Sequence, residues 1–346
     1  ADGNGYVRAG HVMRCLSIAD AAARMGEKCL FITASSDFAA LIGNHGHEVL
    51  VLDSDFRDME SEKAEEYFEK YCPRAFFADS YYVTKAYLDR LLGYCREQGC
   101  TLVCMDDVQA FPYPCDVLVN YNVYAKEKAY RTLYSNIPYL PKLLLGTEYA
   151  PLRAEFADLP GRIVKREARE ILVSTGGADT EHMAVALIRA AAAQKNKKLS
   201  FHFVIGAMNA DKDLIRQMAE EWGNIVLHEN VSEMSGLMQS MDAAVSAAGS
   251  TLYELCATQT PTVTYILADN QIPGGEGFDS REIMQNCGDV RELGREELAG
   301  KLIHEVVELA ANYGKRRQLA RRIRTVVDGK GAERIVEYID FLKSGR

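Results

Sequence analysis

Short apolar segments alternate with helical segments along most of this chain, and that alternation limits its possible folds more than any other feature. Short apolar runs bounded by polar residues are typical of strands buried in a parallel sheet. The pattern predicts an α/β fold in which helices cover parallel sheets. In the first half we predict strands at Lys28–Thr33, Glu48–Asp53, Arg74–Asp79, Thr101–Asp106 and Asp116–Asn120, and helices at Val12–Met25, Ser54–Tyr71 and Thr84–Gln98.

The second half of the chain repeats this architecture but not its sequence. A chain of 346 residues is too long for one ordinary core and long enough for two. We therefore predict two α/β domains. The strands of the second are expected at Glu170–Ser174, Ser200–Ile205, Ile225–His228, Ala243–Ser246 and Thr262–Leu267, and its helices at Thr180–Gln194, Asp211–Trp222, Ser232–Gln239, Thr251–Ala257 and Arg295–Tyr313.

The break between the halves is the segment Pro141–Ala168, whose prolines and charges are typical of a linker. We predict a first domain over residues 1–146, a linker over 147–168 and a second domain over 169–330. The last segment, 331–346, is expected to form a helix that packs back on the first domain. Ligands of open α/β sheets bind beyond the carboxyl ends of the strands, so we expect a ligand in a central cleft that both sheets face.

Composition excludes several classes of partner. The net charge is −9 and no basic stripe occurs, which argues against nucleic acid or an anionic membrane surface. No apolar run approaches the roughly 20 residues needed to cross a bilayer. Nine scattered cysteines without a Cys-x-x-Cys pair indicate a reducing, cytoplasmic setting. The chain begins at Ala1 with a glycine-containing loop, and we expect the strand that normally precedes such a loop to be missing.

That first loop, Asp2-Gly3-Asn4-Gly5 followed by Arg8-Ala9-Gly10-His11, leads directly into the helix at Val12. Glycine permits a close approach of the backbone to a ligand. A histidine at a helix N-terminus has a lowered pKa, and the resulting neutral imidazole can act as a general base near pH 7. A capping or merely buried histidine is the alternative.

Polar residues follow three further predicted strands of the first half. Asp79-Ser80-Tyr81-Tyr82 follows one, and Tyr81 could contact a ligand or simply fill space between the domains. Asp106-Asp107 follows the next, as an acid/base pair or as a helix cap with a solvated neighbour. Asn120 and Asn122 follow the third. No further carboxylate completes a metal-ligand set, so we expect no metal.

The second half offers glycine-containing turns that could bind phosphate through backbone N–H groups. Gly176-Gly177 precedes one predicted helix, and Gly249-Ser250-Thr251 precedes another. Glu254 is placed to bind a ribose diol, or else to form a capping box with Ser250. With Asn270-Gln271 after the next strand, these turns favour a nucleoside diphosphate. The absence of a lysine-bearing P-loop and of an opening Gly-x-Gly-x-x-Gly argues against ATP hydrolysis and NAD, so we expect no cofactor.

Taken in order, the motifs resemble the UDP-2,4-diacetamido-2,4,6-trideoxy-β-L-altropyranose hydrolases of the pseudaminic acid pathway and the related spore-coat polysaccharide proteins. The matching stretches are Gly10-His11-Val12-Met13-Arg14-Cys15-Leu16, Asp79-Ser80-Tyr81, Asn120 to Lys126, Leu145 to Arg153 with Glu155-Phe156, Gly176 to Asp179, Gly249-Ser250-Thr251 with Glu254, and Asn270-Gln271.

This resemblance implies a GT-B fold of two Rossmann-like domains and hydrolysis of the bond between sugar C1 and UDP, without metal and with inversion. We expect the protein to be a monomer. It implies His11 as the general base, with Tyr81 beside it. A GT-B glycosyltransferase and a non-catalytic UDP-sugar-binding protein are the alternatives. The residues that we expect to bind the UDP-sugar are Asp2, Arg8, Gly10, Asn122, Arg153, Gly177, Gly249, Ser250, Thr251, Glu254, Asn270 and Gln271.

Two stretches depart from the family pattern. Val7-Arg8 stands where the family has Ile-Gly, and Arg8 could bind a phosphate or crowd the turn. Ile272–Gly277 replaces an alanine-rich helix, and we expect it to be a loop that leaves the identity of the sugar open.

Overall fold

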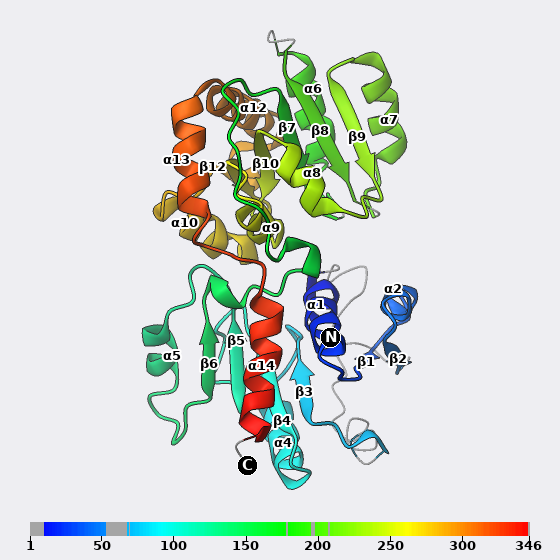
Figure 1. Cartoon of the computed structure of the whole chain (residues 1–346), viewed down its shortest axis with the longest axis vertical. Coiled ribbons are helices and arrows are strands. Elements are labelled where there is room, and N and C mark those ends of the chain that lie inside the picture. The colour runs from blue at the N-terminus through cyan, green and yellow to red at the C-terminus, as the bar shows by residue number, and fades with distance from the viewer. Residues whose placement is uncertain are drawn as a thin grey trace. The chain divides into compact units, whose positions relative to one another are not determined.

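A computed structural model describes residues 10–52, 68, 70–177, 179–194, 198–206 and 208–344 of the chain. The chain forms two compact units, residues 1–154 with 330–346 and residues 155–329 (Figure 1). The segment that the sequence predicts as a linker is thus divided, 147–154 in the first unit and 155–168 in the second. Asp2 and Arg8, and most of the helix expected over Ser54–Tyr71, lie outside the described residues.

The first unit contains a parallel four-stranded sheet of order β3-β4-β5-β6 and a separate parallel pair, β1-β2. The 3₁₀ segment η2 (Ala154–Phe156) spans the boundary with the second unit. The other elements of the first unit are α1 (Gly10–Arg24), β1 (Leu30–Thr33), α2 (Ala39–Asn44), β2 (Glu48–Val51), β3 (Ala75–Ala78), α4 (Lys85–Glu97), β4 (Thr101–Met105), β5 (Val117–Asn120), α5 (Glu127–Leu133), β6 (Lys142–Leu145), η1 (Thr147–Tyr149) and α14 (Gly331–Ser344).

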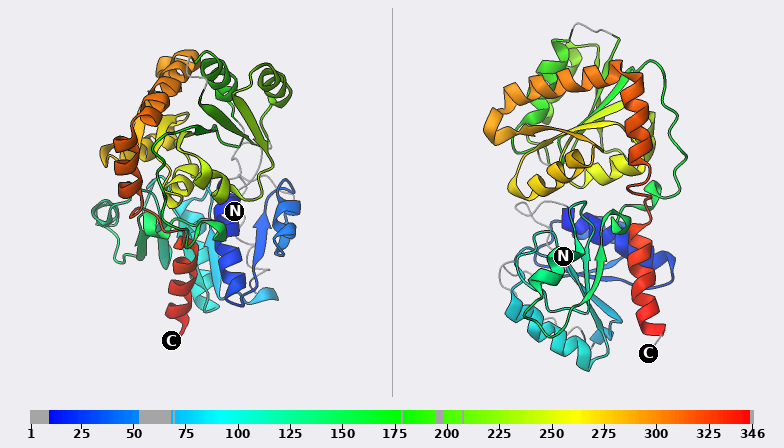
Figure 2. Two further views of the ribbon diagram at one scale, coloured as in Figure 1. Left: turned by 45° about the horizontal axis from the view of Figure 1, so that its top comes forward. Right: turned by 90° about the vertical axis from the view of Figure 1, so that its left-hand side faces the viewer.

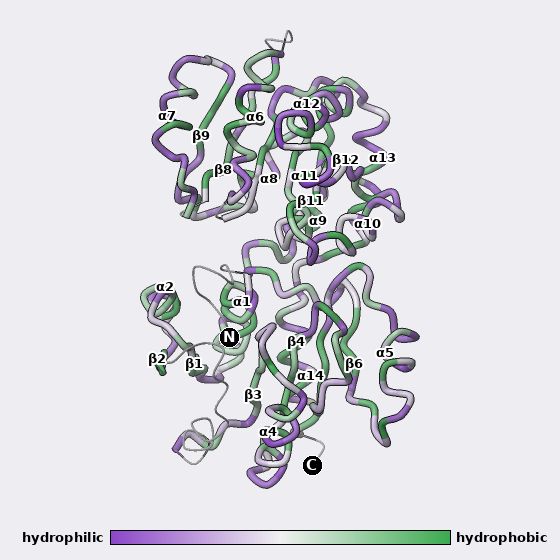
Figure 3. The backbone as a smooth tube through the Cα atoms, turned by 180° about the vertical axis from the view of Figure 1, so that it is seen from behind, coloured by the Kyte–Doolittle hydropathy of each residue, from purple (hydrophilic) through white to green (hydrophobic). Residues whose placement is uncertain are grey.

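Burial of strand β4 from both sides organises this unit. Every residue of its sequence TLVCM is buried, as a strand covered on both faces requires. Helix α4 packs Leu88, Leu91 and Cys95 into the core on one face, and α14 lies on the opposite face (Figure 2). Helix α14 also packs along α1. The hydropathy-coloured backbone shows β4 as a hydrophobic segment (Figure 3).

The second unit contains a parallel six-stranded sheet of order β12-β11-β10-β7-β8-β9. Its chain order reverses between β7 and β10, which is where open α/β sheets bind ligands. Its elements are β7 (Glu170–Ser174), α6 (Met183–Ala192), β8 (Ser200–Ile205), α7 (Lys212–Glu221), β9 (Ile225–Glu229), α8 (Met234–Ser240), β10 (Ala243–Ala247), α9 (Thr251–Ala257), β11 (Thr262–Ile266), η3 (Asp269–Gln271), α10 (Ile272–Ser280), β12 (Gln285–Asp289), α11 (Val290–Leu293), α12 (Arg295–Ala311) and α13 (Tyr313–Ile323).

The predicted α/β class is therefore confirmed: each unit is Rossmann-like, and every strand pair among the described residues is parallel. The edge strands β6 and β12 are absent from the sequence-based prediction. Strand β6 has only four residues and lies within the stretch interpreted as a linker. Strand β12, with the sequence QNCGD, is largely polar because it pairs only with β11. No described helix is long and apolar enough to span a membrane.

The expectation of a loop at Ile272–Gly277 is wrong, because these residues form most of helix α10. Proline at the start of a helix costs nothing, since the missing N–H would have no partner there. Gly275 is buried, and a Cβ atom at this residue would lie 3.1 Å from Cγ1 of Ile266 on β11. The glycine therefore allows α10 to approach the sheet closely.

Replacing Gly275 by alanine should therefore destabilise the protein, although alanine favours helices over glycine by about 1 kcal/mol. The buried, β-branched Ile266 has little freedom to move aside, so we expect a loss of about 1–3 kcal/mol in the free energy of unfolding. Gly274→Ala is the matched control, since the nearest atom is an ordinary 3.9 Å away. Urea denaturation measures both; equal stability of the two variants would contradict the packing argument.

Candidate functional site

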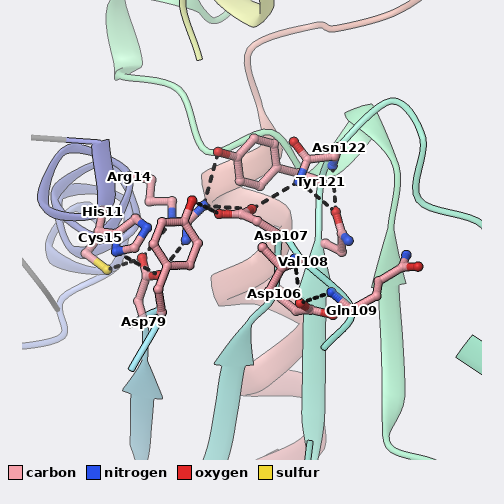
Figure 4. A network of polar contacts seen from close by, with 12 residues as sticks. His11, Arg14, Cys15, Asp79, Asp106, Asp107, Val108, Gln109, Tyr121 and Asn122 are labelled. Atoms are coloured by element: carbon pink, nitrogen blue, oxygen red, sulfur yellow. Dashed lines mark hydrogen bonds and ion pairs between the residues drawn. The ribbon is translucent and has the colours of Figure 1, made fainter. Parts of the chain in front are cut away.

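Helix α1 and the segments that follow three strands of the first unit bring their polar residues together at the carboxyl ends of these strands (Figure 4). Helix α1 supplies His11 and Arg14. Because the strands are parallel, the segments that follow β3, β4 and β5 meet at the same edge, and they supply Asp79, Asp107 and Asn122. The sequence-predicted residues His11, Tyr81 and Asn122 are thereby brought together.

Arg14 is the centre of this network. Its Nε donates to Asp79 Oδ2 at 2.6 Å and its Nη2 to Asp79 Oδ1 at 2.5 Å. Its Nη1 donates to both oxygens of Asp107, at 2.9 and 2.7 Å, and to the Tyr121 hydroxyl at 3.3 Å. The side chain is thus a buried guanidinium bound to two carboxylates.

The buried charges of this cluster stabilise one another. Burial alone would lower the pKa of Arg14, but Asp107 and Asp79 raise it well above its ordinary value. Burial alone would raise the pKa of Asp79, but the charge and hydrogen bonds of Arg14 bring it below its ordinary value. Both groups are therefore ionised at neutral pH.

His11 lies beside this cluster but outside its hydrogen bonds. It is the second residue of α1 and only 4 % exposed. Neither ring nitrogen has a hydrogen-bond partner among the described residues, and Nδ1 lies 3.8 Å from Asp79 Oδ1, beyond hydrogen-bond distance. Two buried nitrogens without partners are a costly feature that a ligand or water would relieve.

The imidazole of His11 is neutral at pH 7. Burial is the largest cause that lowers its pKa, and Arg14 lowers it further, while Asp79 and Asp107 act in the opposite direction. The sequence-based prediction attributes the same neutral state to the helix dipole alone. The structure assigns the main effect to burial.

Tyr81 covers His11. Its ring meets the imidazole edge to face, with 4.4 Å between centroids and 72° between planes. Its hydroxyl donates to Asp107 Oδ2 at 3.2 Å, although the side chain is 42 % exposed. Tyr81 is therefore a partly exposed ring in contact with a buried imidazole.

Asp106 and Asp107 have separate partners. Asp106 accepts the amides of Val108 and Gln109 and the Tyr130 hydroxyl. Burial raises the pKa of Asp106, and these hydrogen bonds oppose the rise. Asp107 faces Arg14 instead. Across the described residues, no group of three or more His, Cys, Asp or Glu side chains is arranged to hold a metal ion.

Asn122 completes the network from the end of β5, donating from Nδ2 to Asp107 Oδ1 at 3.0 Å and to Asn120 Oδ1 at 2.9 Å. Arg153 lies between η1 and η2, in the segment that follows β6, and is not part of this network. Sequence reasoning assigned no role to Arg14. The available signal was its spacing, three residues after His11, which places both on one face of a helix.

The second unit places the predicted nucleotide-binding residues at the ends of three adjacent strands. Gly177 follows β7, Gly249 follows β10, and Asn270 and Gln271 follow β11. The Gln271 side chain accepts the Leu267 amide at 2.9 Å. Its Nε2 lies 3.9 Å from the place that a Cβ atom of Gly249 would occupy. The structure thus brings Gly249 and Gln271 side by side.

Two details of these turns correct the sequence-based interpretation. Helix α6 begins at Met183, not at Thr180, and the Asp179 carboxylate accepts the Met183 and Ala184 amides, so those amides are not available to a phosphate. The Ser250 side chain makes no capping hydrogen bond at the start of α9. Gly249, Ser250 and Thr251 lie at that helix start, with Glu254 in its first turn.

No protein-family model matches the chain. It is 27 % identical over 201 residues to the spore coat polysaccharide biosynthesis protein SpsG of Bacillus subtilis, covering 57 % of this chain and 58 % of that protein. It is 26 % identical over 283 residues to the pseudaminic acid cytidylyltransferase and UDP-2,4-diacetamido-2,4,6-trideoxy-β-L-altropyranose hydrolase of Helicobacter pylori, covering 80 % of this chain and 45 % of that protein. The matches thus span about half the length of these relatives.

Among solved structures, MurG of Acinetobacter baumannii matches with a TM-score of 0.66 at 12 % identity, covering 98 % of each chain. The spinosyn rhamnosyltransferase SpnG matches with a TM-score of 0.61 at 12 % identity, covering 94 % of this chain and 96 % of that one. These likenesses confirm the predicted GT-B fold class. The relatives confirm the predicted resemblance to the two named protein groups.

Removing the Tyr81 ring should expose His11 and raise its pKa toward the ordinary value, because burial is the main cause of the lowered pKa. We expect diethyl pyrocarbonate to modify His11 faster in Tyr81→Ala than in the wild type, as measured by peptide mass spectrometry. Tyr81→Phe keeps the ring and loses the hydroxyl that donates to Asp107, so it should react like the wild type. Equal rates in all three proteins would show that Tyr81 does not cover the imidazole.

Proposed function

We propose that the chain hydrolyses a UDP-linked diacetamido-trideoxy sugar, cleaving the bond between sugar C1 and the UDP oxygen with inversion and without a metal. In this proposal the first unit supplies the general base, His11, and the second unit binds the nucleotide. The residues of the second unit that we expect to contact the nucleotide are Gly177, the Gly249–Thr251 turn with Glu254, and Asn270 and Gln271.

The observation that carries the proposal is the state of His11. Its imidazole is neutral and buried, and both ring nitrogens lack hydrogen-bond partners among the described residues. A general base needs a free nitrogen within hydrogen-bond reach of the proton that it abstracts. The large majority of buried side-chain nitrogens with a purely structural role are hydrogen-bonded.

The proposed reaction is a single displacement. His11 takes a proton from water while the water oxygen attacks C1 of the sugar. The bond between C1 and the UDP oxygen breaks, and its electron pair leaves with UDP, which is an anion at neutral pH and needs little protonation. The proton on His11 then returns to solvent. One base suffices, so the second carboxylate of many glycosidases is not required.

The leaving group needs electrostatic support. Backbone amides at strand-to-helix turns bind phosphate oxygens. The start of α9 has no side-chain cap and offers the amides of Ser250 and Thr251, whereas the Gly249 amide donates to the Ala247 carbonyl. We assign the ribose to Glu254. The name of the Helicobacter pylori relative includes hydrolysis of this class of UDP-sugar, and this supports the choice of substrate.

A glycosyltransferase is the second candidate, because the same neutral base could deprotonate an acceptor hydroxyl in place of water. The Bacillus subtilis relative, named for polysaccharide biosynthesis, favours it. Proton NMR of UDP- and CMP-linked amino sugars incubated with the protein separates the candidates. Hydrolysis releases a free sugar, initially as the inverted anomer. Release only when an acceptor is present would indicate transfer, and binding without any release would indicate a non-catalytic protein.

His11→Asn should lower kcat by about 10²–10⁴-fold, the usual contribution of a positioned base. The affinity for UDP, measured by calorimetry, should be unchanged, because we assign UDP to the second unit. His304→Asn is the control: this histidine is exposed on α12 and should be replaceable without effect. Wild-type turnover by His11→Asn would remove His11 from the mechanism.

A further inference from the structure

Asp79 and His11 lie close enough to suggest a carboxylate–imidazole pair, yet no hydrogen bond joins them. Asp79 Oδ1 lies 3.8 Å from His11 Nδ1, whereas Arg14 binds both oxygens of Asp79 at 2.6 and 2.5 Å. The Cys15 thiol also donates to Asp79 Oδ2 at 3.4 Å. The Asp79 carboxylate therefore accepts its hydrogen bonds from Arg14 and Cys15, and none from His11.

We propose that Arg14 is a positioning residue for His11: its guanidinium holds Asp79 and Asp107 and thereby prevents the carboxylate of Asp79 from pairing with the imidazole. The inference rests on the proposed role of His11 as a base. It adds the residue that keeps the base in its working state.

The geometry explains why an arginine is needed. The Nε and Nη2 atoms form a fork that matches the two oxygens of Asp79, and Nη1 remains for Asp107. A lysine at this residue would be a point charge and could not hold both carboxylates in fixed orientations. Asp79 would then be free to rotate toward His11 and to accept a hydrogen bond from its Nδ1–H group.

Such a pairing would harm a base that must be neutral. A carboxylate hydrogen-bonded to an imidazole stabilises the protonated form and raises its pKa. Among the residues that the structure describes, the charged groups around His11 are Arg14 on its own helix, Asp79 after β3 and Asp107 after β4, with the Tyr81, Tyr121 and Cys15 side chains alongside. Arg14 is the cation of this set, and it offsets the two carboxylates.

The test is the pKa of His11 in the ligand-free protein, followed through the Cε1–H signal in NMR and assigned with His11→Asn. Arg14→Gln should raise this pKa by about one unit or more, and Arg14→Lys should raise it in the same direction because the fork is lost. Asp79→Asn should lower it, because a group that favours the protonated form is removed. Opposite shifts from two partners of one ion pair are not expected of a merely structural role.

Arg24→Gln is the control, since it removes an exposed cation from the far end of the same helix, where it pairs with Glu333. It should leave the His11 pKa unchanged. Circular dichroism shows whether each variant is folded. If Arg14→Gln does not fold, the His11 pKa values of Arg14→Lys and Asp79→Asn test the proposal. A His11 pKa that is unchanged in Arg14→Lys, or that shifts in the same direction in Asp79→Asn and the Arg14 variants, would overturn the proposal.

This titration does not depend on turnover. If His11 titrates as expected while His11→Asn remains fully active, the proposed function fails and the role of Arg14 stands. If the pKa values contradict the inference while His11→Asn is inactive, the inference fails and the proposed function stands.

Discussion

The bond between the Arg14 guanidinium and two carboxylates is the interaction on which the site of the first unit depends. Buried charges are costly unless they are paired and hydrogen-bonded, and here one cation satisfies Asp79 and Asp107 together. In doing so it fastens helix α1 to the ends of β3 and β4. The position of His11 follows, because it lies one helical turn before Arg14.

This arrangement places His11 among charged side chains but leaves it without hydrogen bonds to them. His11 lies next to three charges, yet neither of its ring nitrogens is hydrogen-bonded within the described residues. The Tyr81 ring adds to its burial. Burial and the nearby guanidinium keep the imidazole neutral against the attraction of two carboxylates, and neutrality is the property that a base acting on water requires.

Sequence reasoning predicted those parts of the fold that local patterns specify. Strands β4 and β10 are fully buried and therefore consist mostly of apolar residues. The polar strand β12 and the glycine-containing helix α10 were missed, because contacts with β11 determine them and no local pattern does. Polar composition and helix-breaking residues are compatible with these elements only in their tertiary setting.

The site was predictable to a similar degree. His11 follows a glycine-containing turn and Tyr81 follows a strand, and both patterns are visible in the sequence. The structure places the two rings in contact. The partners of Arg14 are 65 and 93 residues away in the chain, so no local pattern could reveal them. The sequence left Asp106 and Asp107 open between an acid/base pair and a cap with a solvated neighbour. In the structure, the turn after β4 directs the two carboxylates to different partners.

The central claim is that a water molecule activated by His11 attacks the anomeric carbon. Hydrolysis in water enriched in oxygen-18, stopped early and analysed by mass spectrometry of the released UDP, tests it most directly. Attack at C1 leaves the bridging oxygen on the nucleotide, so the account predicts UDP without label. Label in the terminal phosphate of UDP would mean attack at phosphorus and would contradict the account.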